Sequence, residues 1–213
     1  VGLNLEKCDP VYKATIIPRG GALGMVVSLP EIERLSWHKN ECKQKLAMTM
    51  AGKAAEILKW GEEDVSNGPS GDIQQASSLA RAMVMRWGMS DKIGDIDYQA
   101  AHEGYAGGNI GGFSISTKTK ELIEQEVKKL IDDGYTLALS ILKKKKKEFE
   151  RLAQGLLEYE TLTGDEINKI IKGQKLTSED EDVKKEAKPS LAAVPKTSKK
   201  PRKSSESDDK TEK

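Results

Sequence analysis

Residues 12–29 read YKATIIPRGGALGMVVSL. Two runs rich in β-branched and apolar residues, Tyr12–Ile17 and Leu23–Leu29, flank a Pro18-Arg19-Gly20-Gly21 break. Such runs favour extended backbone, whereas proline and paired glycines are typical of turns. The stretch therefore predicts two strands of a small sheet near the start of the chain.

The sequence after Pro30 changes to a helical period. Apolar residues recur there at steps of three and four, which predicts helices. The predicted helices cover residues 42–58, 73–87, 117–142, 149–159 and 164–171. The glycine-rich segment Gly104–Gly112 is expected to be a flexible loop. The predicted fold class is α+β, mainly α: a small N-terminal β-sheet followed by a helical bundle, with the half after Pro30 helical throughout.

A change of composition near Gly173 marks the predicted domain boundary. Beyond it, acidic and basic residues alternate with serine and proline, and large apolar residues are few. Such a segment cannot bury enough apolar surface to offset its conformational entropy. We therefore expect a folded domain over residues 1–172 and a disordered charged tail over residues 173–213. The Lys199–Lys203 cluster is interpreted as solvated, with weak nucleic-acid binding as the alternative.

The composition argues against several classes of protein. The 213 residues are 37% hydrophobic and carry a formal net charge of +1, so the basic field that recruits nucleic acid is missing. No apolar run approaches the roughly 20 residues that span a bilayer, and no secretory leader is recognised. Cys8 and Cys42 are expected to be plain thiols in a reducing, cytoplasmic compartment.

Residue spacing alone reveals no complete active site. The chain lacks the Gly-x-x-x-x-Gly-Lys-Ser/Thr loop that cradles nucleotide phosphates. Its two histidines, His38 and His102, are far apart in the sequence, so they cannot form the closely spaced pair that holds zinc on one helical face. Asp72 stands at a predicted helix start, where a carboxylate suits the free backbone amides.

Two segments nevertheless have the form of known motifs. Ala14–Gly24 closely resembles the Thr-Ile-Ile-Pro-Arg-Gly-x-Ala-Leu-Gly signature of the FtsH family, which are membrane-anchored, ATP-dependent zinc metalloproteases. Gly68–Ile73 resembles the Gly-Ala-Ser-x-Asp-Ile segment of that family. Residues 87–90 (WGMS) and 159–162 (YETL) also match. The resemblance runs from Val1 to about Lys172, which is most of the family's peptidase domain.

The resemblance implies a zinc site of which this chain carries one part. In the family, a His-Glu-x-x-His helix lies just before the segment equivalent to Val1–Leu3, and its two histidines bind zinc while its glutamate activates water. That motif and the ATPase module are absent here, so the chain is expected to be truncated behind the helix and inactive alone. Asp72 matches the zinc-binding aspartate. Zinc is thus the implied cofactor, with ATP used only through the missing module.

The second predicted strand also gains a role from the resemblance. An edge strand beside the metal can pair with an extended substrate backbone, which gives affinity without demanding a particular sequence. Gly24, Met25, Val26 and Val27 are the candidate substrate-binding residues. The alternative, that Leu23–Leu29 is only a core strand, stays open.

The implied partners are protein substrates and further copies of the chain. By resemblance the full-length protein is a homo-hexamer on the cytoplasmic side of a membrane, reached through missing N-terminal segments, that degrades membrane and unfolded proteins. No nucleic-acid partner is expected. An alternative function is a catalytically dead assembly module that joins such a hexamer through its helices.

Overall fold

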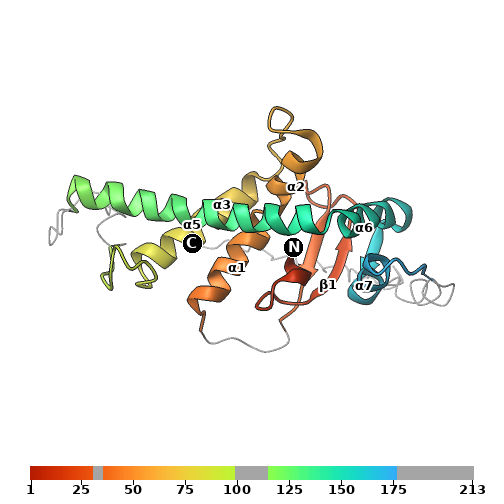
Figure 1. The fold of residues 1–213 in the computed structure, drawn as a ribbon, viewed down its shortest axis with the longest axis horizontal. Helices are drawn as coiled ribbons and strands as arrows, with labels where there is room; N and C mark the ends of the chain where they lie inside the picture. The colour runs from red at the N-terminus through yellow and green to blue at the C-terminus, as the bar shows by residue number, and fades with distance from the viewer. Residues whose placement is uncertain (31–35, 99–114, 177–213) are drawn as a thin grey trace, which may run out of the picture. The chain divides into compact units, whose positions relative to one another are not determined.

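The computed structural model describes residues 1–30, 36–98 and 115–176. Over these ranges the chain forms the predicted α+β fold, mainly α, with one small antiparallel sheet and a set of packed helices (Figure 1). None of the helices in these ranges is both long enough and apolar enough to cross a membrane. The loop expected at Gly104–Gly112 and the tail beyond Leu176 lie outside the described residues.

The sheet has three strands in the order β2-β1-β3. The central strand β1 (Val11–Thr15) runs antiparallel to both β2 (Met25–Ser28) and β3 (Thr161–Thr163). Ala14 lies opposite Leu162 of β3, and both side chains are buried. The short 3-10 turn η1 (Gly2–Asn4) precedes the sheet.

The two N-terminal strands are shorter than predicted because the chain between them closes as a hairpin. Arg19 and Ala22 exchange both backbone hydrogen bonds, each at 3.0 Å. Gly20 and Gly21 between them have φ values of 57° and 87°. A two-residue hairpin turn needs positive φ at both positions, and glycine adopts it without strain.

The strand β3 contradicts the expectation that the chain after Pro30 is helical throughout. It has only three residues, and its partner β1 lies at the other end of the domain sequence. A period cannot be recognised over so short a run, so only the tertiary pairing defines this strand. The preceding Glu160 extends the contact, because its carbonyl accepts the N–H of Ile16 at 2.9 Å.

The helix predicted over residues 42–58 is two helices, α1 (Lys39–Thr49) and α2 (Ala51–Trp60). They meet at Met50, whose φ of −78° and ψ of −3° depart only slightly from helical values. Met50 N–H still donates to Leu46, and Ala54 N–H donates to Met50. The apolar stripe therefore stays in phase through the junction, which is why sequence periodicity predicted one continuous helix.

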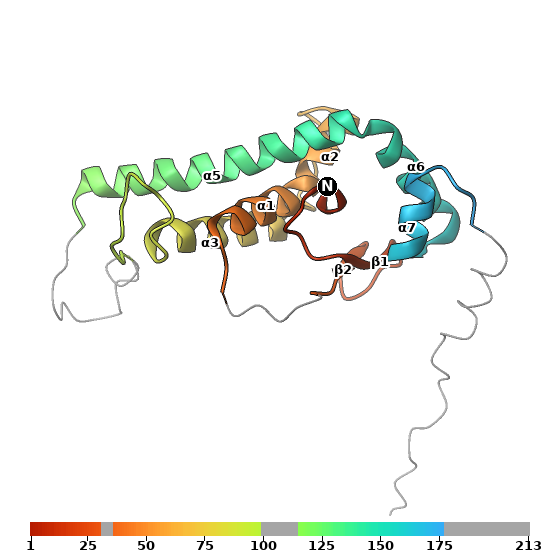
Figure 2. The ribbon, with the colours of Figure 1, turned by 60° about the horizontal axis from the view of Figure 1, so that its bottom comes forward.

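The long helix α5 (Thr117–Lys144) organises the other helices. It begins at Ser116, whose hydroxyl accepts the N–H of Thr119 at 3.2 Å. Helix α1 and helix α3 (Ser70–Met85) pack along it (Figure 2). Their shared apolar core consists of Cys42, Leu46, Met50, Ala76, Ala80 and Met83. Cys42 and the half-buried Cys8 are free thiols, as predicted.

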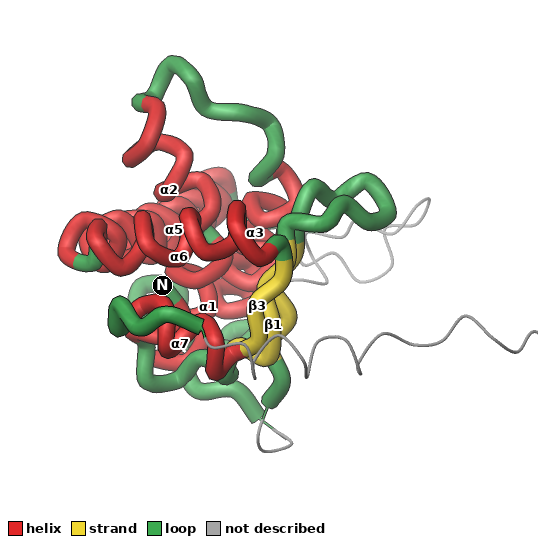
Figure 3. The backbone as a smooth tube through the Cα atoms, turned by 90° about the vertical axis from the view of Figure 1, so that its right-hand side faces the viewer, coloured by secondary structure: helices red, strands yellow, loops and turns green. Residues whose placement is uncertain are grey.

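The last two helices cover the sheet. Helix α6 (Lys146–Tyr159) and helix α7 (Gly164–Ile171) are joined through β3 and lie beside the strands (Figure 3). The predicted capping box is confirmed, since Thr163 N–H donates to Glu166 Oε2 at 2.7 Å and the Thr163 hydroxyl accepts the N–H of Glu166. Buried residues of this second core are Ala14, Leu162, Ile167 and Ile170.

Candidate metal and substrate site

Asp72 lies in the first turn of α3, as the sequence predicted. The helix begins at Ser70 with Pro69 at the N-cap, so Asp72 is the third helical residue and not the cap itself. A carboxylate in the first turn is favoured by the positive end of the helix dipole. The backbone therefore accommodates a negative side chain at this position without requiring it as a cap.

The carboxylate of Asp72 faces the first turn of α2. A Cβ built on Gly52 would lie 3.3 Å from Asp72 Oδ2, so glycine leaves the room that this carboxylate occupies. Within the described residues, no hydrogen bond or ion pair reaches Asp72. Burial raises the pKa of Asp72 above its ordinary value, because partial removal from water disfavours the charged form. Asp72 is thus a half-desolvated oxygen donor without a partner.

A hydrogen-bonded contact, which we call the Glu56–Ser66 latch, holds the loop that leads to Asp72. The Glu56 carboxylate on α2 accepts the Ser66 N–H at 2.9 Å and the Ser66 hydroxyl at 2.9 Å. The Ser66 hydroxyl in turn accepts the N–H of Gly68 at 3.1 Å. Sequence reasoning missed Glu56, because a glutamate within a helix is ordinarily solvated and no motif marks this one.

The described residues do not by themselves fit a zinc ion. Structural and catalytic zinc sites need at least three protein ligands, and these ranges contain no group of three histidine, cysteine or acidic side chains close enough to share a metal. His38 caps α1 in a capping box with Glu41, and His102 lies outside the described residues. Asp72 can supply one ligand only.

The strand β2 forms an edge of the sheet as described. Leu29 N–H, just after the strand, donates to Pro10 at 3.2 Å. Because backbone groups alternate in direction along a strand, odd-numbered residues of β2 face β1. The N–H and C=O groups of Val26 and Ser28 therefore point away from the sheet, where an extended peptide could pair with them.

The candidate residues of β2 are not core residues. The side chains of Met25 and Val26 are 42% and 66% exposed, whereas Val27 is half-buried. Gly24 precedes the strand, and a Cβ there would lie 2.8 Å from the carbonyl oxygen of Thr15. Glycine at this position is thus required by the neighbouring strand, whatever binds to the edge.

Asp72 and β2 belong to different packing units of the domain. Helix α3 shares its core with α1 and α5, whereas the sheet packs against α6 and α7. No described hydrogen bond or ion pair joins Asp72 to residues 24–27. The structure thus presents a metal ligand and a peptide edge as two separate features.

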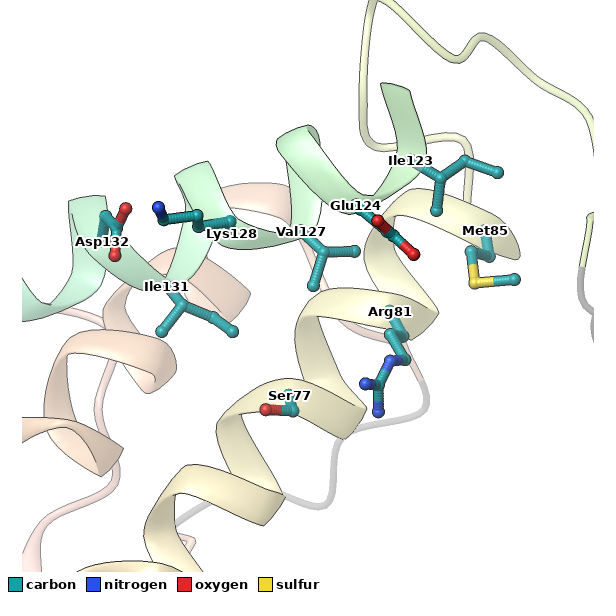
Figure 4. Close-up of a pocket in the computed structure, with 9 residues that line it drawn as sticks. All are labelled: Ser77, Arg81, Met85, Ile123, Glu124, Val127, Lys128, Ile131 and Asp132. Atoms are coloured by element: carbon teal, nitrogen blue, oxygen red, sulfur yellow. The ribbon is translucent and has the colours of Figure 1, made fainter. Parts of the chain in front are cut away.

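A pocket of about 390 Å³ lies between α3 and α5 (Figure 4). Met85, Ile123 and Val127 are among its apolar lining residues. Charged side chains of both signs, Arg81, Glu124, Lys128 and Asp132, surround them and form no ion pair with one another. The mixture suits a polar contact and gives no donor set for a metal.

A second pocket, of about 550 Å³, lies between α2 and α6. Its lining includes Phe149, Trp60 and Leu157, the last two 62% and 70% exposed. Glu56 also lines it. This pocket is the more apolar of the two and leaves two large side chains in contact with water.

Comparison with known proteins places the chain in a family. The model of peptidase family M41 matches residues 1–170. An "ATP-dependent zinc metalloprotease FtsH" of Rickettsia bellii is 44% identical over 181 residues, covering 85% of this chain and 28% of the relative. That of Caulobacter vibrioides is 44% identical over 175 residues, covering 81% and 28%. An "ATP-dependent zinc metalloprotease YME1 homolog" of Schizosaccharomyces pombe is 41% identical over 175 residues, covering 82% and 23%.

The chain thus spans about a quarter of the length of these relatives. The match includes the segments around Ala14–Gly24 and Gly68–Ile73 that carried the resemblance, and it confirms an FtsH-like peptidase domain. The chain belongs to peptidase family M41.

Proposed function

We propose that this chain is the peptidase portion of an ATP-dependent zinc metalloendopeptidase that degrades membrane and unfolded proteins. The observation that carries the proposal is the Asp72 carboxylate, which is partly desolvated at a helix start, without a hydrogen-bond partner, beside the glycine that makes room for it. An unpaired carboxylate of this kind is costly unless it has a ligand to bind.

Asp72 supplies one oxygen donor to a zinc ion whose other protein ligands come from outside this chain. The peptidase domain extends over residues 1–172, and residues 173–213 form a charged tail. ATP is used by a separate module, and the whole protein assembles as a homo-oligomer on the cytoplasmic side of a membrane. Residues 1–213 alone neither hold zinc tightly nor cleave protein, since one carboxylate does not complete a zinc site.

The substrate is an extended peptide that pairs with the outer edge of β2. The backbone groups of Val26 and Ser28 face outward, and main-chain pairing supplies affinity that is independent of sequence. This suits an enzyme that acts on many unfolded chains.

The metal role is tested by comparing two aspartates. Residues 1–213 are expressed alone and joined behind the upstream part of the Rickettsia bellii relative, and zinc content and casein degradation are measured. We expect both properties only in the joined protein. There, Asp72→Asn should weaken zinc binding by more than about 100-fold, beyond the loss expected for a merely supporting residue.

Asp165→Asn is the matched control, because Asp165 also lies in the first turn of a helix. It should leave zinc affinity unchanged. Equal zinc affinity in the two variants would refute the role of Asp72. Zinc-dependent cleavage by residues 1–213 alone would refute the predicted inactivity.

The edge role is tested with Val26→Pro in the joined protein. Proline removes an N–H that faces away from β1, so the sheet keeps its ladder. We expect a higher KM for a peptide substrate with unchanged zinc content, and Val26→Ala as control should behave like the wild type. An unchanged KM in Val26→Pro would count against peptide pairing at this edge.

A catalytically dead assembly module is the second candidate function. The exposed Trp60 and Leu157 beside the α2–α6 pocket favour it, because large exposed apolar side chains are typical of interaction surfaces. Mixing residues 1–213 with an intact relative should then change the mass of the assembly. An unchanged mass would exclude this function.

A further inference from the structure

The loop between α2 and α3 (residues 61–69) contains an Asn67-Gly68 pair. Both residues are exposed, and neither lies in a helix or strand. In such a pair the glycine backbone nitrogen can attack the side-chain amide carbon of asparagine, since glycine has no side chain to hinder it. A C–N bond forms, the nitrogen loses its proton to water, and the side-chain nitrogen leaves as ammonia. Water then opens the cyclic imide to aspartate or isoaspartate.

The structure singles out Asn67 among the asparagines that it describes. Asn40 lies in α1 and Asn168 in α7, where the following backbone N–H is held within the helix. Asn4 is followed by Leu5, whose N–H donates to Gly2 at 3.1 Å. Only Asn67 is followed by a glycine in a loop.

The Glu56–Ser66 latch restrains the attacking nitrogen. Gly68 N–H donates to the Ser66 hydroxyl at 3.1 Å, and that hydroxyl is fixed by the Glu56 carboxylate at 2.9 Å. For attack, the Gly68 nitrogen must turn toward the Asn67 side chain and lose its proton. Both changes require the hydrogen bond to Ser66 to break.

We propose that Asn67 is a deamidation site whose rate is set by the Glu56–Ser66 latch. When the latch is closed, the Gly68 nitrogen is held by Ser66 and the amide of Asn67 persists. When it opens, the loop reaches the geometry for imide formation. The reaction consumes one water and releases one ammonia, so no oxidant or enzyme is needed.

The modification alters the segment that positions Asp72. The Asn67 carbonyl accepts the N–H of Ser70, the first residue of α3, at 3.1 Å. Isoaspartate inserts a methylene into the backbone at residue 67, and either product adds a negative charge there. The expected weaker zinc binding rests on the proposed function, whereas the modification itself does not.

The test follows deamidation of residues 1–213 in a mildly alkaline buffer. Peptide mapping by mass spectrometry gives the converted fraction at each asparagine over time, and an isoaspartyl methyltransferase assay identifies isoaspartate. Ser66→Ala removes the hydroxyl and should speed conversion of Asn67 about fivefold, the factor that corresponds to one net hydrogen bond of about 1 kcal/mol. Ser66→Thr keeps a hydroxyl and should convert at close to the wild-type rate.

Asn40 and Asn168 serve as internal controls in the same digests. If they stay unmodified while Asn67 converts faster in Ser66→Ala, the latch controls the site. If Asn67 converts no faster than these two, or if Ser66→Ala has the wild-type rate, the proposal is overturned. In the joined protein, Asn67→Asp should lower zinc affinity. Unchanged affinity would overturn the effect on Asp72.

Discussion

Gly134→Ala tests the close approach of α1 and α5. Gly134 lies in the middle of α5, where the two helices pack together. A Cβ at this position would lie 3.1 Å from the carbonyl carbon and from the Cβ of Leu46, and 3.2 Å from the nitrogen of Ala47. Backbone atoms of α1 cannot rotate away as the end of a flexible side chain does. The added methyl group must therefore push the helices apart.

Two opposing effects set the magnitude. Alanine is favoured over glycine within a helix by about 1 kcal/mol, whereas overpacking a closed core costs about 1–3 kcal/mol. Because the crowded atoms belong mainly to backbone, we expect the second effect to win. The net loss in the free energy of unfolding is about 1–2 kcal/mol, which lowers Tm by about 2–8 °C in a domain of this size.

The assay is urea unfolding followed by circular dichroism. Gly71→Ala is the matched control, since Gly71 is also helical but has no atom within 4 Å of its Cβ position. That variant should be as stable as the wild type or slightly more stable. If Gly134→Ala were at least as stable as the wild type, the tight contact between α1 and α5 would be wrong.

Three further substitutions test local interactions by the same unfolding assay. The Lys92 ammonium, and after it the Ser90 hydroxyl, lower the pKa of Glu126, so this carboxylate stabilises the fold above its unfolded pKa of about 4.3, and the contribution is lost as pH falls through the lower folded pKa. Glu126→Gln should cost about 1–3 kcal/mol at neutral pH, and a gap that persists in strong acid would contradict this. Burial raises the pKa of Asp72, so its charge opposes folding above that pKa; Asp72→Asn should be at least as stable as the wild type at neutral pH, and a clear loss would refute the reasoning. Glu160 has a φ of 59°, so Glu160→Gly should gain about 1 kcal/mol, and a lower stability would show that the strain is absent.

The helices of this protein were predictable because their signal is local. An apolar stripe repeats every three to four residues whatever the helix packs against, and the Thr163–Glu166 capping box is complete within four residues. The hairpin was predictable for the same reason, since Gly20 and Gly21 define the turn by themselves. The sequence could not show β3, because three residues carry no period, nor the junction at Met50, which leaves the stripe in phase.

For the candidate site, the sequence by itself determined the family and the position of Asp72 at a helix start. Both are properties of short continuous strings, Ala14–Gly24 and Gly68–Ile73. Only the tertiary structure decided that the Asp72 carboxylate lies over Gly52 and that Glu56 holds the loop before it. These contacts join α2 to residues that follow it across a loop, and burial and hydrogen-bond distance are set by where the two segments meet in space.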